Sequence, residues 1–185
     1  FSPVVKKALE TVSKKISVID IIDKQEILKD AKKIGELEYE SFLSTGNENF
    51  IWKRPDDEWQ AISLSYTSGT TGNPKGVVYH HRGGYLMATG SVTAWNMPNR
   101  LNFLYTVPMF HCNGWCYPWT LAMLHARVIC IRNIRAKEIF ELISEHKITH
   151  FGGAPIILNM LANAPKEEQI KLNHKVYVLT AAAPP

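Results

Sequence analysis

Strand-like runs alternate with stretches of helical period along the last two thirds of the chain. A strand that alternates apolar and polar residues is expected at 61–66. Four further strands, rich in Val, Ile, Leu and aromatic residues, are expected at 103–107, 127–131, 148–151 and 176–179. The clearest helix lies at 135–146, where apolar residues share one face. Because strands that alternate with helices form crossover connections, this order predicts an α/β fold with a mainly parallel sheet and helices on both faces.

The first sixty residues are less regular. A helix is expected at 4–12, a buried strand at 16–22, and a polar helical stretch over 25–44. A loop should follow over 45–60. The sequence starts without Met and stops directly after a strand-like run, so both ends look cut. We expect residues 1–185 to form a single partial domain.

Composition excludes several function classes. The 21 Lys and Arg residues against 17 Asp and Glu give a formal net charge of +4, and this charge is not gathered into the basic stripe typical of nucleic-acid binding. The three cysteines, Cys112, Cys116 and Cys130, make an odd number in a chain too large to need disulfides, which indicates free thiols in a reducing compartment. No uncharged apolar run approaches the roughly 20 residues that span a bilayer, and no secretory leader opens the chain. We therefore expect a cytoplasmic protein with no nucleic-acid partner.

A glycine- and threonine-rich segment, 67–76, directly follows the strand expected at 61–66 and has the groups needed to hold a polyphosphate. Its glycines let backbone amides approach an anion closely, and its hydroxyls and one ammonium group are donors. It is not a Walker P-loop, because position 74 is proline and Gly76 follows Lys75 without a metal-binding hydroxyl. The expected nucleotide-binding residues are Thr67, Ser68, Gly69, Thr70, Thr71, Gly72 and Lys75.

A second group of reactive residues lies in the aromatic segment 107–119 (VPMFHCNGWCYPW). A metal site made by His111, Cys112 and Cys116 is one interpretation. Zinc sites normally need a fourth ligand, or three ligands and a water, and often contain Cys-x-x-Cys pairs. No such pair and no nearby fourth ligand are evident, so we expect no protein-bound metal and a structural role for the cysteines.

Residues 66–77 (YTSGTTGNPKGV) closely resemble the phosphate-binding signature of the adenylate-forming superfamily. This superfamily contains acyl- and aryl-CoA ligases, luciferases and the adenylation domains of peptide synthetases. The resemblance implies that a carboxylate attacks the α-phosphate of Mg-ATP to give an acyl-adenylate and pyrophosphate. Coenzyme A then displaces AMP. ATP, Mg²⁺ and coenzyme A are thus the expected cofactors, with Mg²⁺ carried by ATP near Thr70, and the catalytic candidates are Thr70, Lys75 and His111.

The segment containing Phe110, His111 and Gly114 resembles the acid-substrate segment of the same superfamily, most closely that of fatty-acyl-CoA ligases. The resemblance implies that His111 lines the carboxylate site and that Trp115 gates an acyl tunnel. Tyr117 and Trp119 are expected to be core aromatics. A later segment, 151–155, corresponds to one beside the acyl pocket. The expected substrate-binding residues are His111, Asn113, Gly114, Trp115 and Gly153.

The end of the chain, 179–185 (LTAAAPP), resembles the adenine-side loop of the superfamily, with alanines at the usual glycine positions 181 and 182. Nucleotide contacts are expected from Ala181, Ala182, Ala183 and Pro184. The Thr-Glu acid, the ribose-binding aspartate and the C-terminal lysine of the superfamily are missing. The chain is therefore expected to be the middle of the large N-terminal, ATP-binding domain, without its start and without the small C-terminal domain.

The function predicted from this resemblance is that of an acid–thiol ligase fragment, inactive by itself. Its full-length parent would activate a fatty or short- to medium-chain carboxylic acid with ATP and transfer it to coenzyme A. Two alternatives stay open. The parent could load the thiol of a carrier protein, or it could be a nucleotide-binding module without catalysis. The resemblance leaves open whether the full-length protein is a homodimer.

Overall fold

The computed structural model describes residues 2–23, 32–67 and 72–181 of the 185-residue chain. The chain divides between Arg54 and Pro55 into two compact units. The N-terminal unit is built from short elements, and its two strands pair in parallel over two residues each. The helix expected at 4–12 is confirmed. The elements of this unit are α1 (Ser2–Glu10), β1 (Ile19–Asp20), β2 (Leu37–Glu38) and α2 (Tyr39–Leu43).

Two expectations for the N-terminal unit are wrong. The run at 16–22 is not a buried strand, because its ladder is two residues long and Ile21 is 79% exposed. Residues 32–38 are not helical. The Asp20 carboxylate accepts hydrogen bonds from the backbone N–H groups of Ile34 and Gly35, at 3.1 and 2.9 Å, and this holds the segment beside β1. Residues 25–31 of the expected helical stretch lie outside the described residues, and its last part is confirmed as α2. The loop over 45–60 is also confirmed.

The main sheet of the C-terminal unit has four strands in the order β6-β5-β7-β8, and every pairing in it is parallel. Each strand lies where the sequence predicts one. Successive strands are separated by helical connections, as expected for a parallel sheet. The strands are β5 (Asn102–Tyr105), β6 (Arg127–Cys130), β7 (His150–Gly152) and β8 (Tyr177–Leu179).

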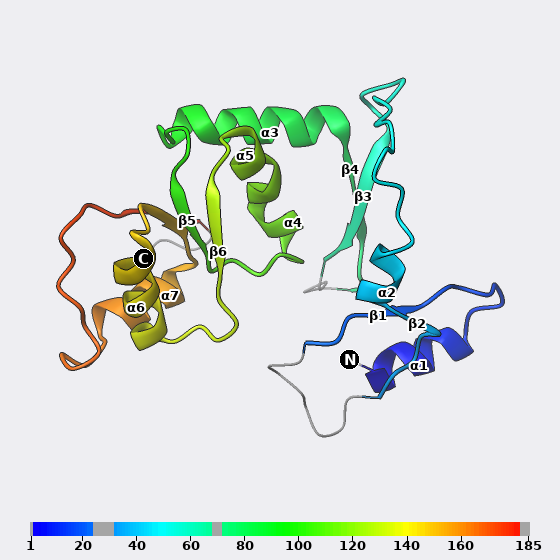
Figure 1. The fold of residues 1–185 in the computed structure, drawn as a ribbon, viewed down its shortest axis with the longest axis horizontal. Coiled ribbons are helices and arrows are strands. Elements are labelled where there is room, and N and C mark those ends of the chain that lie inside the picture. Colours follow the sequence, from blue (N-terminus) through cyan, green and yellow to red (C-terminus); the bar gives the residue numbers. More distant parts are fainter. Residues whose placement is uncertain (1, 24–31, 68–71, 182–185) are drawn as a thin grey trace. The chain divides into compact units, whose positions relative to one another are not determined.

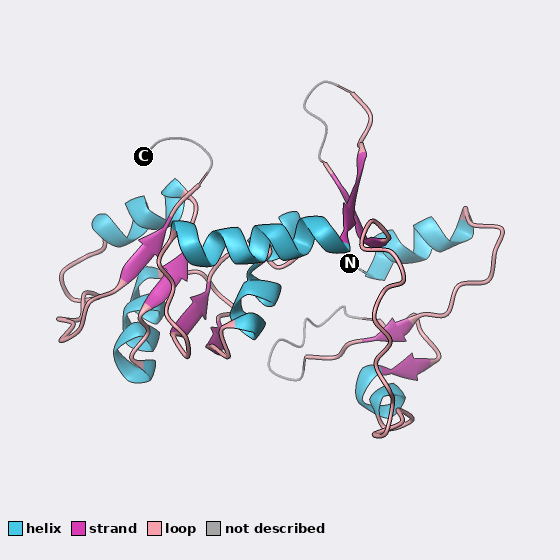
Figure 2. Ribbon diagram, turned by 90° about the horizontal axis from the view of Figure 1, so that it is seen from above, coloured by secondary structure: helices cyan, strands magenta, loops and turns pink. Residues whose placement is uncertain are grey.

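Helices cover both faces of this sheet, as predicted (Figures 1 and 2). Phe103 and Tyr105 belong to one apolar cluster, while Leu104 between them belongs to the other. This separation follows from the alternation of side chains along a strand. Helices α3 (His81–Ala94) and α5 (Tyr117–Met123) lie with the first cluster, and α6 (Ala136–His146) and α7 (Pro155–Ala162) with the second.

A separate antiparallel hairpin precedes α3. It consists of β3 (Ala61–Tyr66), which the sequence predicts, and β4 (Gly76–His80), which it does not. Thr67 and Lys75 close the connection: the Thr67 N–H donates to the Lys75 carbonyl at 3.0 Å, and the Lys75 N–H donates to the Thr67 hydroxyl at 3.3 Å. The His80 ring accepts from the Gly83 N–H at 3.0 Å and caps α3. The glycine-rich segment therefore connects two paired strands, and the second of them leads directly into a helix.

The packing of α6 against the sheet gives a stability prediction. Ile139 is fully buried, whereas Ile156 on α7 is 73% exposed. We expect Ile139→Ala to lower the free energy of unfolding by about 2–5 kcal/mol because it leaves a cavity in the core. Ile156→Ala, the matched control, should change it by less than about 0.5 kcal/mol. Urea unfolding measures both values, and equal effects of the two substitutions would contradict this packing.

Candidate functional site

The expected phosphate-binding residues that the structure describes lie at the end of the hairpin. Tyr66 pairs with Gly76 as the last pair of the ladder. Beyond it the Lys75 side chain is exposed, and Gly72 has no atom within 4 Å of where a Cβ would be. The Lys75 ammonium is thus available to an anion. Four expected contacts lie outside the described residues: Ser68, Gly69, Thr70 and Thr71.

The segment expected to bind the acid forms a left-handed turn, which the sequence analysis did not predict. It coincides with α4 (Cys112–Trp115) and the residue that follows. Left-handed φ angles cost about 1–2 kcal/mol for each non-glycine residue, so contacts around the turn must hold it. The φ angles are 49° for Cys112, 51° for Asn113, 62° for Gly114, 58° for Trp115 and 58° for Cys116.

A buried hydrogen bond fixes the middle of this turn to the main sheet. The Tyr105 hydroxyl donates to the Gly114 carbonyl at 2.9 Å. Burial raises the pKa of Tyr105 to about 12, so the phenol keeps its proton and remains a donor. A Cβ at Gly114 would lie 1.9 Å from the Tyr105 oxygen. The lack of space therefore requires glycine at this position, and the positive φ favours it.

A second hydrogen bond connects the turn to the hairpin. The Asn113 side-chain amide donates to the Ser63 hydroxyl at 3.0 Å, and the contact is partly buried. Ser63 lies on β3, the strand that leads into the loop closed by Thr67 and Lys75. One amide donor of Asn113 is therefore directed at β3.

His111 lies at the start of the turn and is exposed. Its carbonyl accepts from the Gly114 N–H at 2.8 Å, so its backbone is part of the turn. Its ring nitrogen Nε2 lies 3.9 Å from the Cys112 sulfur. The imidazole can therefore reach a ligand outside the protein core.

A cavity of about 340 Å³ joins the turn to three other parts of the C-terminal unit. Trp115 lies at its wall, with its ring centroid 6.1 Å from that of the buried Tyr117, which confirms Tyr117 as a core aromatic. Trp95 packs on the same tyrosine at 5.8 Å. The lining carries no charged side chain. It consists of Tyr79 from β4, Met87 from α3, Trp95 just after α3, Cys112, Trp115 and Cys116 from the turn, and Ala181 after β8.

Two expected site residues, Trp115 and Ala181, thus meet at one cavity. Gly153 does not line it: this residue is buried, and its N–H donates to the Leu179 carbonyl at 2.8 Å. Ala182, Ala183 and Pro184 lie outside the described residues. Sequence reasoning missed Ser63, Tyr79, Met87 and Trp95. The alternation along β3 was the available signal for Ser63, and no pattern marked the other three.

The cysteines are free, as expected. Cys112 is exposed and Cys116 buried, and burial raises the pKa of Cys116, with a further contribution from Cys112. The pKa of Tyr79 is also raised, mainly by burial and further by Cys112 and Cys116, including a side-chain hydrogen bond to Cys112. Within the described ranges, no group of three or more His, Cys, Asp or Glu side chains is placed to hold a metal ion. None of the described helices is both long and apolar enough to cross a membrane.

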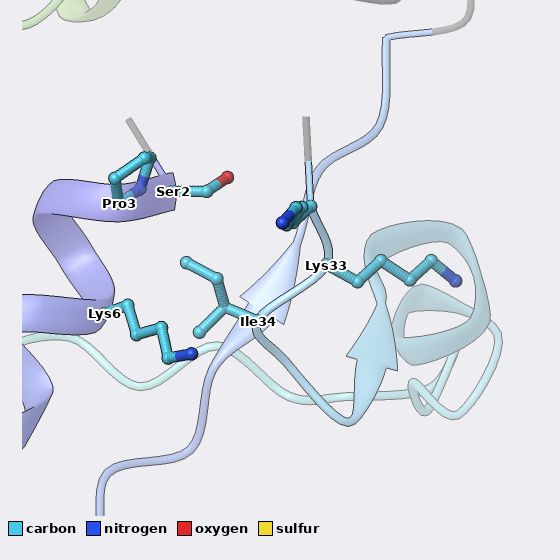
Figure 3. Close-up of a pocket in the computed structure, with 6 residues that line it drawn as sticks. Ser2, Pro3, Lys6, Lys33 and Ile34 are labelled. Carbon is cyan, nitrogen blue, oxygen red and sulfur yellow. The ribbon is translucent and has the colours of Figure 1, made fainter. Parts of the chain in front are cut away.

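The N-terminal unit has its own cavity of about 670 Å³, lined by Ser2, Pro3, Lys6, Lys32, Lys33 and Ile34 (Figure 3). It contains none of the expected site residues. Ile34 points toward Lys6, while the Lys33 side chain extends away from both. The side chains of Lys6 and Lys33 therefore point in different directions.

Comparison with known proteins adds to this geometry. The family model described as AMP-binding enzyme matches residues 2–185. A peroxisomal acetate/butyrate–CoA ligase of Arabidopsis thaliana is 53% identical over 86% of the chain, and an acetate–CoA ligase of Humulus lupulus is 50% identical over 85%. The chain spans 28% of the length of each. The inhibitor-bound N-terminal domain of FACL13 from Mycobacterium tuberculosis superposes with a TM-score of 0.68 at 27% identity, covering 80% of this chain and 38% of that one.

The left-handed turn makes a prediction about two glycines. Gly114→Ala should lower the free energy of unfolding by at least about 2 kcal/mol, because the added Cβ meets the Tyr105 oxygen and the φ is positive. Gly90 lies inside α3 with open space around a new Cβ, so Gly90→Ala should raise stability by up to about 1 kcal/mol. Thermal and urea unfolding of the two variants check the signs. A neutral Gly114→Ala would show that the turn is not held as described.

Proposed function

Because the chain belongs to the family of AMP-binding enzymes, we propose that the protein carrying it activates a carboxylic acid with ATP and transfers the acyl group to coenzyme A. One observation carries the proposal. The turn with His111 and Trp115 shares a cavity with Ala181 and is hydrogen-bonded to the strand that enters the glycine-rich loop. Acyl-adenylate formation needs a carboxylate and an α-phosphate held in contact with the right orientation. A site in which these segments meet is suited to that task.

The residues have separate roles in the proposed reaction. The carboxylate oxygen attacks the α-phosphorus, a new P–O bond forms, and pyrophosphate leaves with the electron pair of the broken bond. Lys75 and Thr70 donate to the phosphates, and His111 donates to the carboxylate or to the developing adenylate. Mg²⁺, held by the phosphates near Thr70, would neutralise their charge. No described cluster of three or more carboxylate, His or Cys groups would hold the ion in place of ATP.

The lining of the cavity favours an uncharged acyl chain. Aromatic rings, thiols and a thioether surround about 340 Å³ without a charged group. Two relatives are named as ligases of acetate or of acetate and butyrate, which supports a short acyl chain. We propose that Trp115 limits or gates the acyl pocket, since its ring lies between the buried Tyr117 and the cavity.

Two rival functions make different demands. An adenylation domain that loads a carrier protein would use a protein-bound thiol in place of coenzyme A, and a non-catalytic module would bind ATP without consuming it.

The cytosol is the compartment that we propose, because free thiols fit a reducing environment. The peroxisome is the alternative, as the name of the Arabidopsis relative indicates for that protein.

Acyl-CoA formation by the full-length protein tests the proposal. A panel of acids from acetate to medium-chain and aryl acids is incubated with ATP, Mg²⁺ and coenzyme A, and both pyrophosphate and acyl-CoA are measured. Short-chain acids should give both products, and Lys75→Ala should lower the rate roughly 100- to 1000-fold. Trp115→Ala should shift the chain-length profile while the protein stays folded. Pyrophosphate without acyl-CoA would favour a carrier-protein acceptor, and no turnover of any acid would favour the non-catalytic module.

A further inference from the structure

The hairpin and the left-handed turn touch each other through both strands of the hairpin. On β3, the Ser63 hydroxyl accepts from the Asn113 amide at 3.0 Å. On β4, Tyr79 lines the same cavity as Cys112 and Trp115 of the turn. Both contacts join the segment proposed to hold ATP to the segment proposed to hold the acid.

We propose that Ser63 and Asn113 are a positioning pair, which aligns the acid-binding turn with the phosphate-binding loop for acyl-adenylate formation. The inference rests on the proposed function and deepens it. Neither side chain needs to contact a substrate in this role. Asn113 acts through the turn that carries His111 and Trp115, and Ser63 acts through the strand that enters the loop.

The turn has a fixed partner on each side. Tyr105 on β5 holds the Gly114 carbonyl and so ties the turn to the main sheet. Ser63 holds the neighbouring side chain and ties the same turn to the hairpin. Loss of the Tyr105 bond would release a turn with left-handed φ angles. Loss of the Ser63 bond leaves that bond intact and changes the alignment of hairpin and turn.

Asparagine suits this position for two reasons. It is among the few non-glycine residues that adopt left-handed φ angles with little cost, and its φ here is 51°. Its amide also offers a donor that reaches β3. Glycine would keep the backbone conformation but lose the donor, so Asn113→Gly separates the two contributions.

The two half-reactions should depend on this alignment to different degrees. In the first, the carboxylate and ATP are separate molecules, and the protein alone brings the carboxylate oxygen to the α-phosphorus. In the second, the coenzyme A thiolate attacks the acyl carbon, the bond from that carbon to the phosphate oxygen breaks, and AMP leaves with the electron pair. The acyl group and the phosphate are already bonded to each other in the adenylate. Alignment between their two sites is then supplied by the covalent bond.

The test compares half-reactions in the full-length protein. Acid-dependent exchange of pyrophosphate into ATP reports the first, and conversion of added acyl-adenylate and coenzyme A to acyl-CoA reports the second. Ser63→Ala and Asn113→Gly should each lower the maximal exchange rate by about 10- to 100-fold, the scale expected for a misplacement of about 1 Å. Conversion of the added adenylate, the KM for ATP and the thermal midpoint should stay close to those of the parent.

Three further variants control the interpretation. Ser63→Thr keeps a hydroxyl on a strand that tolerates β-branched residues, so it should restore most of the exchange rate. The double variant Ser63→Ala/Asn113→Gly should be no slower than the slower single variant, because both remove the same bond. Asn96, which also has a positive φ of 48° and is exposed, gives the matched substitution Asn96→Gly, and this should leave both half-reactions unchanged.

Each outcome of these experiments either supports or overturns the role proposed for Ser63 and Asn113. Equal loss in both half-reactions, additive single effects, or no rescue by Ser63→Thr would overturn it, as would single variants with the exchange rate of the parent. Should Ser63→Ala fail to fold, Ser63→Thr and Asn113→Gly still give the comparison. A parent that carries out neither half-reaction with any acid would instead reject the proposed function, so the two failures are distinguishable.

Discussion

The hydrogen bond from the Tyr105 phenol to the Gly114 carbonyl determines where the left-handed turn lies on the main sheet. Tyr105 is the last residue of the central strand β5, and its ring packs with Phe103 and Tyr117 in the apolar cluster beneath α3 and α5. The core thus fixes the phenol, the phenol fixes the turn, and the turn places His111 and Trp115. A change in the packing around Tyr105 would therefore also move His111, which is exposed and lies at the start of the turn.

The segments that contain expected site residues follow the carboxyl ends of strands in the main sheet. The turn comes after β5, Gly153 after β7, and Ala181 after β8. In open α/β sheets, ligands bind outside the carboxyl ends of the strands. The antiparallel hairpin that carries the proposed phosphate-binding loop meets the turn through Ser63 and Tyr79. The proposed site thus lies at the carboxyl ends of the parallel strands, as is usual in α/β folds, and the proposed nucleotide-binding loop belongs to a separate hairpin.

The sequence was informative where periodicity decides structure. The four strands of the parallel sheet and α6 lie within a few residues of their predicted positions. The strands were found as apolar runs, which are typical of parallel sheets, although only β5 and β7 are mostly buried and the edge strands β6 and β8 are largely exposed. The N-terminal unit was predicted less well, since the path of residues 32–38 depends on the side chain of Asp20. The left-handed turn depends on Tyr105, and its local signals are Asn113 and Gly114, two residues that tolerate positive φ. Met87 and Trp95 line the cavity because of the position at which α3 packs in the C-terminal unit. That position depends on tertiary packing and cannot be predicted from a local sequence pattern.

The central claim is that this site joins a carboxylate to the α-phosphate of ATP, and the fate of the carboxylate oxygen tests it most directly. The full-length protein would be supplied with a short-chain acid whose carboxylate carries heavy oxygen, together with ATP, Mg²⁺ and coenzyme A. Mass spectrometry of the products then locates the label. Adenylate formation predicts that one labelled oxygen appears in AMP and none in pyrophosphate. Labelled inorganic phosphate, or AMP without label while acyl-CoA accumulates, would contradict the account.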